Sequence, residues 1–207
     1  MVIKGDFNDD EFDDLAGVTA SSQVRYSTNL TSWVYITGEL KTIVTGDFNG
    51  DGNDDIAGVD SIGQLWYTTD MISWTNMPGT AISIVTGDLD GDGDDDIAGI
   101  NPDGVISKIF YTTDLSTWTP IPGLITSIVA GDFDGDGDDD IAGINPDGVT
   151  ANIFYTTDLV NWNIIFGALD MITTGNFDDD GRDDLAGVDS SGMTYYTTDL
   201  ATWTDIP

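Results

Sequence analysis

The residues best suited to chemistry lie in an acidic segment, residues 131–144, with the sequence GDFDGDGDDDIAGI. Six of the nine residues from 132 to 140 are aspartates, and positions 1, 3, 5 and 9 of this stretch hold Asp132, Asp134, Asp136 and Asp140. Gly137 at position 6 allows a sharp turn, and the carbonyl of Asp138 stands at position 7. Because oxygen atoms at alternate positions converge on one point, the spacing predicts a calcium-binding loop.

This loop differs from that of an EF-hand. An EF-hand carries a bidentate glutamate at position 12 and lies between two helices. Position 12 here is Gly143, and the flanking segments SIVAGDF and DIAGI are apolar and typical of strands. The sequence therefore predicts a calcium loop between two β-strands.

The acidic segment occurs five times. Its copies begin at Gly5, Gly46, Gly87, Gly131 and Gly175, so successive copies are 41, 41, 44 and 44 residues apart. A run of like charges is usually a solvated and disordered segment, but a strand-like apolar segment follows every copy in this chain. We therefore interpret the chain as an array of five folded repeats.

Composition limits the possible functions. The 207 residues are 40% hydrophobic, which is enough for a core, and they include no cysteine and no histidine. Disulfides, thiolate metal sites and histidine-dependent catalysis are therefore excluded. The formal net charge is -33 with five Lys plus Arg, so nucleic acid is not an expected partner. The apolar runs are too short for a membrane span, and no signal segment opens the sequence.

Enzymatic activity is not expected either. Glycoside hydrolysis, for example, needs two carboxyl groups that face one bond, one of them with a raised pKa. The two glutamates are Glu11, inside an acidic loop, and Glu39, between repeats, while the loop aspartates are assigned to metal. Without histidine or cysteine, no nucleophile, base and orienting group can be assembled.

A second phrase, such as FYTTDLSTW, recurs in step with the acidic segment. One repeat begins with a strand before the acidic loop and a second strand after it. A Gly-containing turn such as NPDG or DSSG follows, then a third strand ending in YTTD and a fourth strand beginning at Trp. Four short strands in about 40 to 45 residues is the period of a β-propeller blade. We therefore predict an all-β fold, a five-bladed β-propeller with four antiparallel strands per blade and a calcium loop between strands one and two. The single domain, residues 1–207, has predicted blades at 1–41, 42–82, 83–126, 127–170 and 171–207.

Each repeat also carries one tyrosine and one tryptophan at fixed places. The tyrosines, from Tyr26 to Tyr196, and the tryptophans, from Trp33 to Trp203, are predicted to pack between blades. The residue before each tyrosine points to the opposite face of its strand and varies, with Arg25 in the first repeat. Packing is one role for this row, and stacking on sugar rings is the other. The candidate ligand-binding residues are Trp66, Phe110, Phe154 and Tyr195.

The two ends of the chain predict how the ring is completed. The segment MVIKGDF already forms an innermost strand, and WTDIP forms an outermost one. Each blade is thus expected to come from one continuous segment, with no exchange of strands between the termini. We expect the ring to close by packing of the fifth blade against the first.

The repeats resemble FG-GAP/VCBS repeats, the calcium-loop blades of integrin α-chain heads and of many secreted or lectin-like propellers. The resemblance covers essentially the whole chain, although propellers of this type commonly have seven blades. It implies up to five calcium ions, each bound by side chains at loop positions 1, 3, 5 and 9 and a backbone carbonyl at position 7. The implied ligands in position order are Asp6, Asn8, Asp10, Phe12 and Asp14 in loop one; Asp47, Asn49, Asp51, Asn53 and Asp55 in loop two; Asp88, Asp90, Asp92, Asp94 and Asp96 in loop three; Asp132, Asp134, Asp136, Asp138 and Asp140 in loop four; and Asn176, Asp178, Asp180, Arg182 and Asp184 in loop five.

These observations leave three classes of function. We expect a calcium-stabilised extracellular or cell-surface binding module, lectin-like or adhesive, with glycans or cell-surface proteins as partners. A structural or assembly repeat domain and, less favoured, a glycosidase-like enzyme are the alternatives. The loops should also differ in affinity. Loops three and four should bind calcium most tightly, loop two should be intermediate, and loops one and five should be weakest because of Glu11 at position 6 and Arg182 at position 7.

Overall fold

The computed structural model describes residues 1–102, 108–145 and 152–206, and every regular element in these ranges is a β-strand. Twenty strands form five separate four-stranded sheets, here called blades one to five, and all neighbouring strands are antiparallel. The all-β prediction with four antiparallel strands in each repeat is therefore confirmed. No helix in these ranges has the length and apolar character that crossing a membrane requires.

The strands follow the chain in order within each blade. Blade one holds β1 (Val2–Gly5), β2 (Asp14–Val18), β3 (Gln23–Ser27) and β4 (Val34–Glu39). Blade two holds β5 (Thr42–Gly46), β6 (Asp55–Val59), β7 (Gln64–Thr68) and β8 (Thr75–Thr80). Blade three holds β9 (Ser83–Gly87), β10 (Asp96–Asn101), β11 (Lys108–Thr112) and β12 (Thr119–Ile121). Blade four holds β13 (Ser127–Gly131), β14 (Asp140–Ile144), β15 (Ile153–Thr156) and β16 (Asn163–Ile165), and blade five holds β17 (Met171–Gly175), β18 (Asp184–Val188), β19 (Thr194–Thr197) and β20 (Thr204–Ile206).

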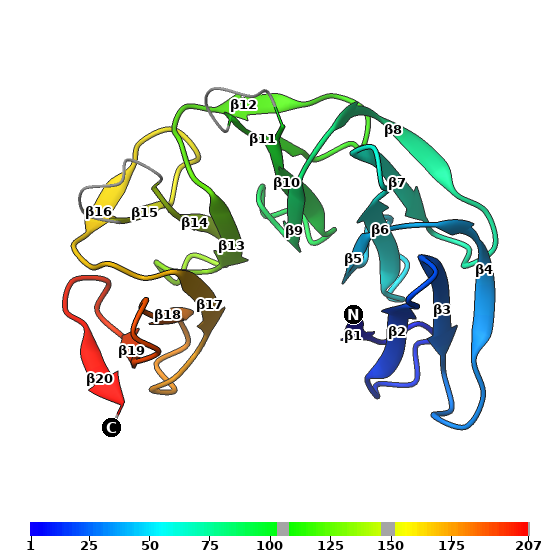
Figure 1. Cartoon of the computed structure of the whole chain (residues 1–207), viewed down its shortest axis with the longest axis horizontal. Helices are drawn as coiled ribbons and strands as arrows, with labels where there is room; N and C mark the ends of the chain where they lie inside the picture. Colours follow the sequence, from blue (N-terminus) through cyan, green and yellow to red (C-terminus); the bar gives the residue numbers. More distant parts are fainter. Residues whose placement is uncertain (103–107, 146–151, 207) are drawn as a thin grey trace.

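The sheet order confirms that each blade comes from one continuous segment, without strand exchange between the termini. The strand β1 lies on the inner side of the blades and β20 on the outer side, as expected from the terminal sequences (Figure 1). The exact blade boundaries and the treatment of the chain as one domain stay predictions. The turn predicted at residues 189–192 is present, with the Gly192 N–H donating to the Asp189 carbonyl at 2.9 Å. The NPDG turns of repeats three and four fall largely on 103–104 and 146–148, outside the described residues.

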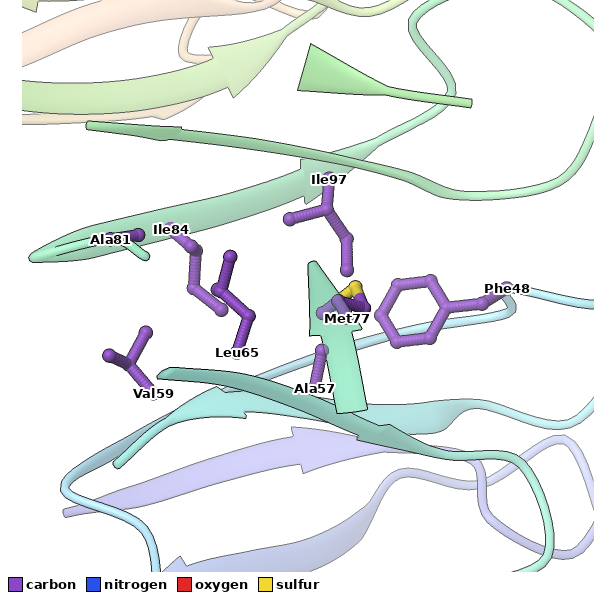
Figure 2. Close-up of a cluster of buried hydrophobic side chains, with 8 residues drawn as sticks. All are labelled: Phe48, Ala57, Val59, Leu65, Met77, Ala81, Ile84 and Ile97. Atoms are coloured by element: carbon purple, nitrogen blue, oxygen red, sulfur yellow. The ribbon is translucent and has the colours of Figure 1, made fainter. Parts of the chain in front are cut away.

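The hydrophobic core lies between neighbouring blades. At the junction of blades two and three, Phe48 and Leu65 from blade two pack with Ile84 and Ile97 from blade three (Figure 2). The tyrosine of the earlier blade and the tryptophan of the later blade pack against each such cluster, as Tyr67 and Trp118 do here. The prediction that these aromatic residues pack between blades is therefore confirmed at the four junctions.

The prediction of a closed ring is wrong. The inner strands β1, β5, β9, β13 and β17 contact one another in succession, but the extensive contacts do not continue from β17 to β1. Figure 1 shows the five blades as an open arc, with blades one and five at its two ends. The physical reason is that all four junctions repeat one set of contacts. These contacts fix the angle between neighbours, and five blades at that angle do not complete a turn.

At the two ends of the arc, residues whose equivalents are buried at the junctions between blades are exposed. Phe177 in blade five is 46% exposed, whereas the equivalent Phe133 of blade four is 3% exposed. At the other end, Val2 is 62% exposed and the equivalent Ile43 of blade two is fully buried. The apolar residues of the end blades thus follow the repeat pattern without a neighbour to cover them.

Candidate metal loops and inter-blade pockets

Each acidic loop connects the first and second strands of a blade, as predicted. Its last aspartate, at position 9, is the first residue of the second strand and is buried in all five blades. The carboxylate of this aspartate accepts a hydrogen bond from the backbone N–H at position 2. In loop four the Phe133 N–H donates to Asp140 Oδ2 at 2.8 Å, and in loop three the Leu89 N–H donates to Asp96 Oδ2 at 2.9 Å. This contact fixes the loop to the base of the strand pair.

The residue at position 1 organises the rest of the loop. In loop three, the Asp88 carboxylate accepts hydrogen bonds from the N–H groups of Gly91, Asp92 and Gly93 at 2.8 to 3.1 Å. Loop two has the same pattern, in which the Gly52 N–H donates to Asp47 Oδ2 at 2.8 Å. The loop backbone is therefore wrapped around one carboxylate, with the other acidic side chains beside it.

Loops three and four bring their carboxylates closest together. Oxygen atoms of Asp88, Asp90 and Asp96 in loop three lie within 4.8 Å of one another, and so do those of Asp132, Asp134 and Asp136 in loop four. Asp92 and Asp140, the remaining predicted side-chain ligands of these loops, lie outside the two groups. A donor set made of carboxylate oxygens suits a calcium ion, which takes six to eight oxygen ligands. The residues of loops three and four therefore fit the metal that the sequence predicts.

In loops one and two, position 3 is an asparagine whose amide nitrogen, not its oxygen, faces a loop carboxylate. The amide nitrogen of Asn8 donates to Asp14 Oδ2 at 2.8 Å, and that of Asn49 donates to Asp55 Oδ2 at 3.3 Å. An asparagine binds calcium through its carbonyl oxygen, so these side chains must turn before they can act as ligands. In loop five, the oxygen of Asn176 accepts a hydrogen bond from the Asp179 N–H at 2.7 Å. The metal ligands assigned to all five loops stay predictions.

The electrostatic state of the loops favours a cation. Burial, the largest cause, raises the pKa of Asp55, Asp96 and Asp140 to about 7, and repulsion from the other loop carboxylates adds to this effect. Each of these carboxyl groups is therefore partly protonated near neutral pH unless a positive ion compensates the charge. A divalent ion at the centre of the loop would supply that compensation.

The loop turns at positions 4 and 6 need left-handed backbone. Gly91 and Gly93 have φ values of 74° and 93°, and the glycines of loops two and four are similar. In loop one the same positions hold Asp9 and Glu11, with φ values of 56° and 66°. A non-glycine residue in this region is strained, so the expected penalty at Glu11 is present in the backbone.

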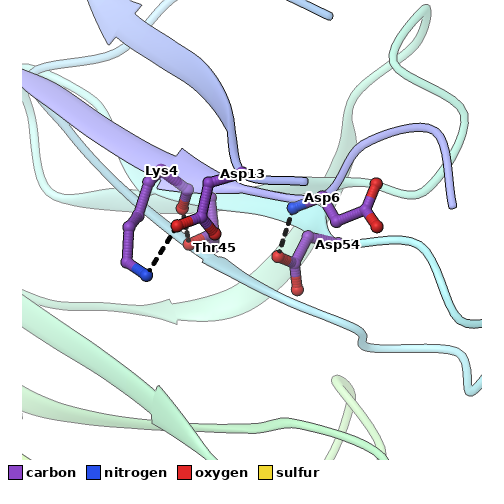
Figure 3. A network of polar contacts seen from close by, with 5 residues as sticks. All are labelled: Lys4, Asp6, Asp13, Thr45 and Asp54. Atoms are coloured by element: carbon purple, nitrogen blue, oxygen red, sulfur yellow. Dashed lines mark hydrogen bonds and ion pairs between the residues drawn. The ribbon is translucent and has the colours of Figure 1, made fainter. Parts of the chain in front are cut away.

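Position 8 has a role that sequence reasoning missed. Each of the four internal junctions has a backbone hydrogen bond in which the position-8 aspartate of one blade donates to the position-1 carbonyl of the preceding blade. In Figure 3, the Asp6 N–H also donates to the Asp54 carboxylate at 2.8 Å. The Asp47 N–H and the Asp95 carboxylate repeat this contact at 2.9 Å. We call this pair of hydrogen bonds between positions 1 and 8 a clamp. The signal for it in the sequence is an aspartate at position 8 of all five repeats, which has no part in the ligand pattern.

Blade one has no preceding blade, and its position-8 residue has a different partner. The Asp13 carboxylate pairs with Lys4 Nζ at 2.9 Å on the surface (Figure 3). The side chain of Thr45 in blade two donates to the Lys4 carbonyl at 2.8 Å, which adds a further contact across the first junction. The internal junctions thus share a polar clamp beside their apolar core.

Four equivalent pockets lie at the four junctions, and each contains one of the candidate ligand-binding residues. Each pocket combines that residue with the tryptophan of the same blade and a glycine from the preceding blade. The pocket pairs are Trp66 with Trp74, Phe110 with Trp118, Phe154 with Trp162, and Tyr195 with Trp203. The structure therefore brings each candidate into a partly open pocket beside a tryptophan.

Every pocket also contains one oxygen-bearing side chain from the end of the second strand. These residues are Asp60, Asn101, Asn145 and Asp189. The Asp60 carboxylate accepts a hydrogen bond from Trp66 Nε1 at 3.3 Å, and the Asp189 carboxylate accepts one from Tyr195 Oη at 3.3 Å. Sequence reasoning missed these polar residues, although they occupy one position in four repeats.

In the described part of the chain, blade one has no neighbour on the side where the other four blades form these pockets. Arg25, which replaces the variable aromatic residue there, lies over the ring of Trp33 with its guanidinium carbon 4.2 Å from the ring centroid. This cation–π contact covers a tryptophan that would otherwise lack the packing it has at the junctions.

Two of the acidic-loop blades match a known family of repeats. The FG-GAP repeat model matches residues 80–114 and 125–156, which contain loops three and four with their flanking strands. No curated protein is similar enough to the chain to count as a match. The matched segments are the two whose loops have glycine at both turn positions and three clustered carboxylates. The chain therefore carries FG-GAP repeats, and its five four-stranded sheets have the architecture of blades in a repeat β-propeller.

Proposed function

We propose that this protein is a calcium-stabilised extracellular binding module that recognises carbohydrate through its inter-blade pockets. The observation that carries the proposal is the fourfold recurrence of one pocket, with two aromatic side chains and one Asp or Asn. Packing alone requires the tryptophan, but it does not require a pocket with a polar residue beside it. The family match is consistent with a binding role for the blades.

The chemistry of these pockets suits a sugar ring. An apolar face of the sugar can stack on an aromatic side chain, while a carboxylate or amide accepts or donates hydrogen bonds to hydroxyl groups. Trp66 and Asp60 offer this combination at the first junction, and Tyr195 and Asp189 offer it at the fourth. Repeated pockets of one kind also favour a ligand with repeated or clustered sugars, because linked sites gain affinity together.

Calcium would serve as a structural ion in this proposal. The loops lie next to the position-8 clamps, so an ion held by Asp88 and Asp90 would stiffen the same edge of the blade that contacts its neighbour. Weak loop sites fill at millimolar calcium, which supports an extracellular or cell-surface location. The excess of 38 Asp plus Glu over five Lys plus Arg also favours a function in which cations compensate the acidic groups.

Catalysis has no part in the proposal. The chain has no histidine or cysteine, and the aspartates with the most strongly raised pKa values are Asp55, Asp96, Asp139 and Asp140, in the predicted metal loops and the clamps. The exposed apolar ends of the arc support a second candidate, an assembly domain whose partner covers those ends.

Binding to a glycan array with calcium present, followed by titration calorimetry with the best ligand, tests the proposal. Trp66→Ala and Tyr195→Ala should each weaken binding, whereas Tyr35→Ala, at an exposed aromatic residue outside the pockets, should not. Thermal unfolding of each variant shows whether the fold is kept. Absence of glycan binding by the folded wild-type protein would favour the assembly alternative.

A further inference from the structure

The side chain at loop position 7 crosses the junction to the preceding blade. Three blades show this arrangement: the Asp94 carboxylate lies against Gly50 of loop two, the Asp138 carboxylate against Gly91 of loop three, and the Arg182 side chain against Gly135 of loop four. Each of these glycines stands at position 4, between the predicted ligands at positions 3 and 5. The residue at position 7, whose carbonyl is a predicted ligand of its own loop, therefore extends its side chain to the loop before it.

The contacts are close enough to restrict the sequence. A Cβ atom added at Gly50, Gly91 or Gly135 would meet the neighbouring side chain at less than ordinary contact distance. Position 4 is Asp179 in loop five, the last acidic loop of the sequence, and Asp9 in loop one. Loop one is followed by Asn53, whose amide nitrogen donates to Asp51 of its own loop at 2.8 Å. Glycine at position 4 thus accompanies a charged side chain that arrives from the next blade.

The charge of the arriving side chain acts on the receiving loop. The Asp138 carboxylate lies against Gly91, between the predicted ligands Asp90 and Asp92 of loop three. The Asp94 carboxylate has the same place beside Gly50, between Asn49 and Asp51 of loop two. A calcium ion held among those ligands would attract a carboxylate in this place and repel a guanidinium group.

We propose that the calcium sites of loops two, three and four are each shared across a junction, so that the position-7 side chain of the next blade sets the affinity of the preceding loop. Asp94 and Asp138 strengthen loops two and three, and Arg182 weakens loop four. This inference rests on the calcium binding in the proposed function. It also reassigns Arg182, since the sequence alone suggested that its charge would act on loop five.

Loops three and four make a natural comparison. Both carry aspartate at positions 1, 3, 5, 7, 8 and 9 and glycine at positions 4 and 6, so their own residues predict equal affinity. The arriving side chains differ, because loop three receives Asp138 and loop four receives Arg182. Loop three should therefore bind calcium more tightly than loop four.

Site-resolved calcium titration of the full chain by amide NMR tests this inference, with Gly93, Gly137 and Gly181 as reporters of loops three, four and five. Arg182→Gln should tighten loop four by about threefold to tenfold and leave loop five nearly unchanged. Asp138→Asn should weaken loop three by a similar factor. Lys41→Gln and Asp170→Asn make the same changes in net charge outside the acidic loops, and they control for the general effect of charge.

The outcomes separate the inference from the function on which it rests. If Arg182→Gln tightens loop five alone, or Asp138→Asn weakens loop four alone, each side chain acts on its own loop and the inference is overturned. If both variants change the loops no more than their controls do, it is overturned as well. If no loop of the wild-type protein titrates at millimolar calcium, the calcium part of the proposed function fails first. Spectral dispersion shows that each variant is folded, and Asp94→Asn repeats the test at loop two.

Discussion

Asp6 and Asp54 are joined by two reciprocal hydrogen bonds across the first junction. The Asp54 N–H donates to the Asp6 carbonyl at 2.6 Å, and the Asp6 N–H donates back to the Asp54 carboxylate at 2.8 Å. The second junction repeats the pair with Asp47 and Asp95. Because the clamp joins the base of one acidic loop to the end of the next, blade packing and loop geometry are mechanically linked.

Removal of a clamp carboxylate should destabilise the protein. Asp95→Ala leaves the partly buried Asp47 N–H without its acceptor, which should cost about 1 to 3 kcal/mol of unfolding free energy. Asp13→Ala is the matched control, because Asp13 stands at the same repeat position but makes a surface ion pair with Lys4. That control should change stability by less than about 1 kcal/mol. Urea unfolding measures both, and equal losses would contradict the role of the clamp.

Calcium-free protein should become less stable as pH rises from about 5 to about 8. The folded-state pKa values of Asp139, at about 6, and of Asp55, Asp96 and Asp140, at about 7, lie above the ordinary value of 3.8. The folded state therefore binds more protons than the unfolded state in this range. The stability that these groups contribute is complete below their unfolded pKa and is lost as pH rises through the folded values.

Melting temperatures measured in chelator across this pH range check the prediction. Saturating calcium should flatten or reverse the trend, because the ion stabilises the ionised carboxylates and protons compete with it. Asp139→Asn should reduce the slope in chelator, since it removes one of the groups whose pKa is raised most. A melting temperature that rises with pH in chelator would show that the raised pKa values do not govern stability.

Chelation at neutral pH should lower the melting temperature clearly. A site with a dissociation constant near 0.1 to 1 mM contributes on the order of 0.5 to 1.5 kcal/mol at millimolar calcium, and up to five sites add to one another. Repulsion within the emptied loops adds to the loss and is largest at low salt. Calorimetry with EDTA, at low and high sodium chloride, measures both effects. Identical melting curves with and without chelator would refute calcium stabilisation.

One pair of equivalent phenylalanines should reveal the open ends of the arc. Phe133→Ala removes a ring that is buried at an internal junction and should cost about 3 to 5 kcal/mol. Phe177 has the same place in blade five but is 46% exposed, so Phe177→Ala should cost much less. Equal costs in chemical unfolding would indicate that the end of blade five is covered in solution, by blade one or by another molecule.

The sequence predicted the blades well because their signals are local. The period of the acidic loops, the strand-like segments around them and the terminal sequences were enough to assign all five sheets. Ring closure was predicted wrongly because the angle between blades depends on contacts such as Asp54 with Asp6, which join residues 48 positions apart. The sequence also did not show that the Arg182 side chain points to the preceding loop, for a related reason. Loop spacing indicates which carbonyl faces the ion but does not show where the side chain goes.

Loop one offers a test of the backbone strain. Glu11 has φ of 66° and its N–H donates to Asp6 Oδ2 at 2.8 Å, as the Gly52 N–H donates to Asp47 in loop two. Glu11→Gly keeps this hydrogen bond and removes the strain of a left-handed non-glycine residue, so it should stabilise the protein by about 1 kcal/mol and tighten loop one for calcium. Glu11→Gln removes the charge but keeps the strain, and it separates the two effects. The reverse change, Gly52→Ala, should destabilise loop two by a similar amount. Urea unfolding and the calcium titration of loop one give the answer, and a gain from Glu11→Gln as large as that from Glu11→Gly would assign the effect to charge.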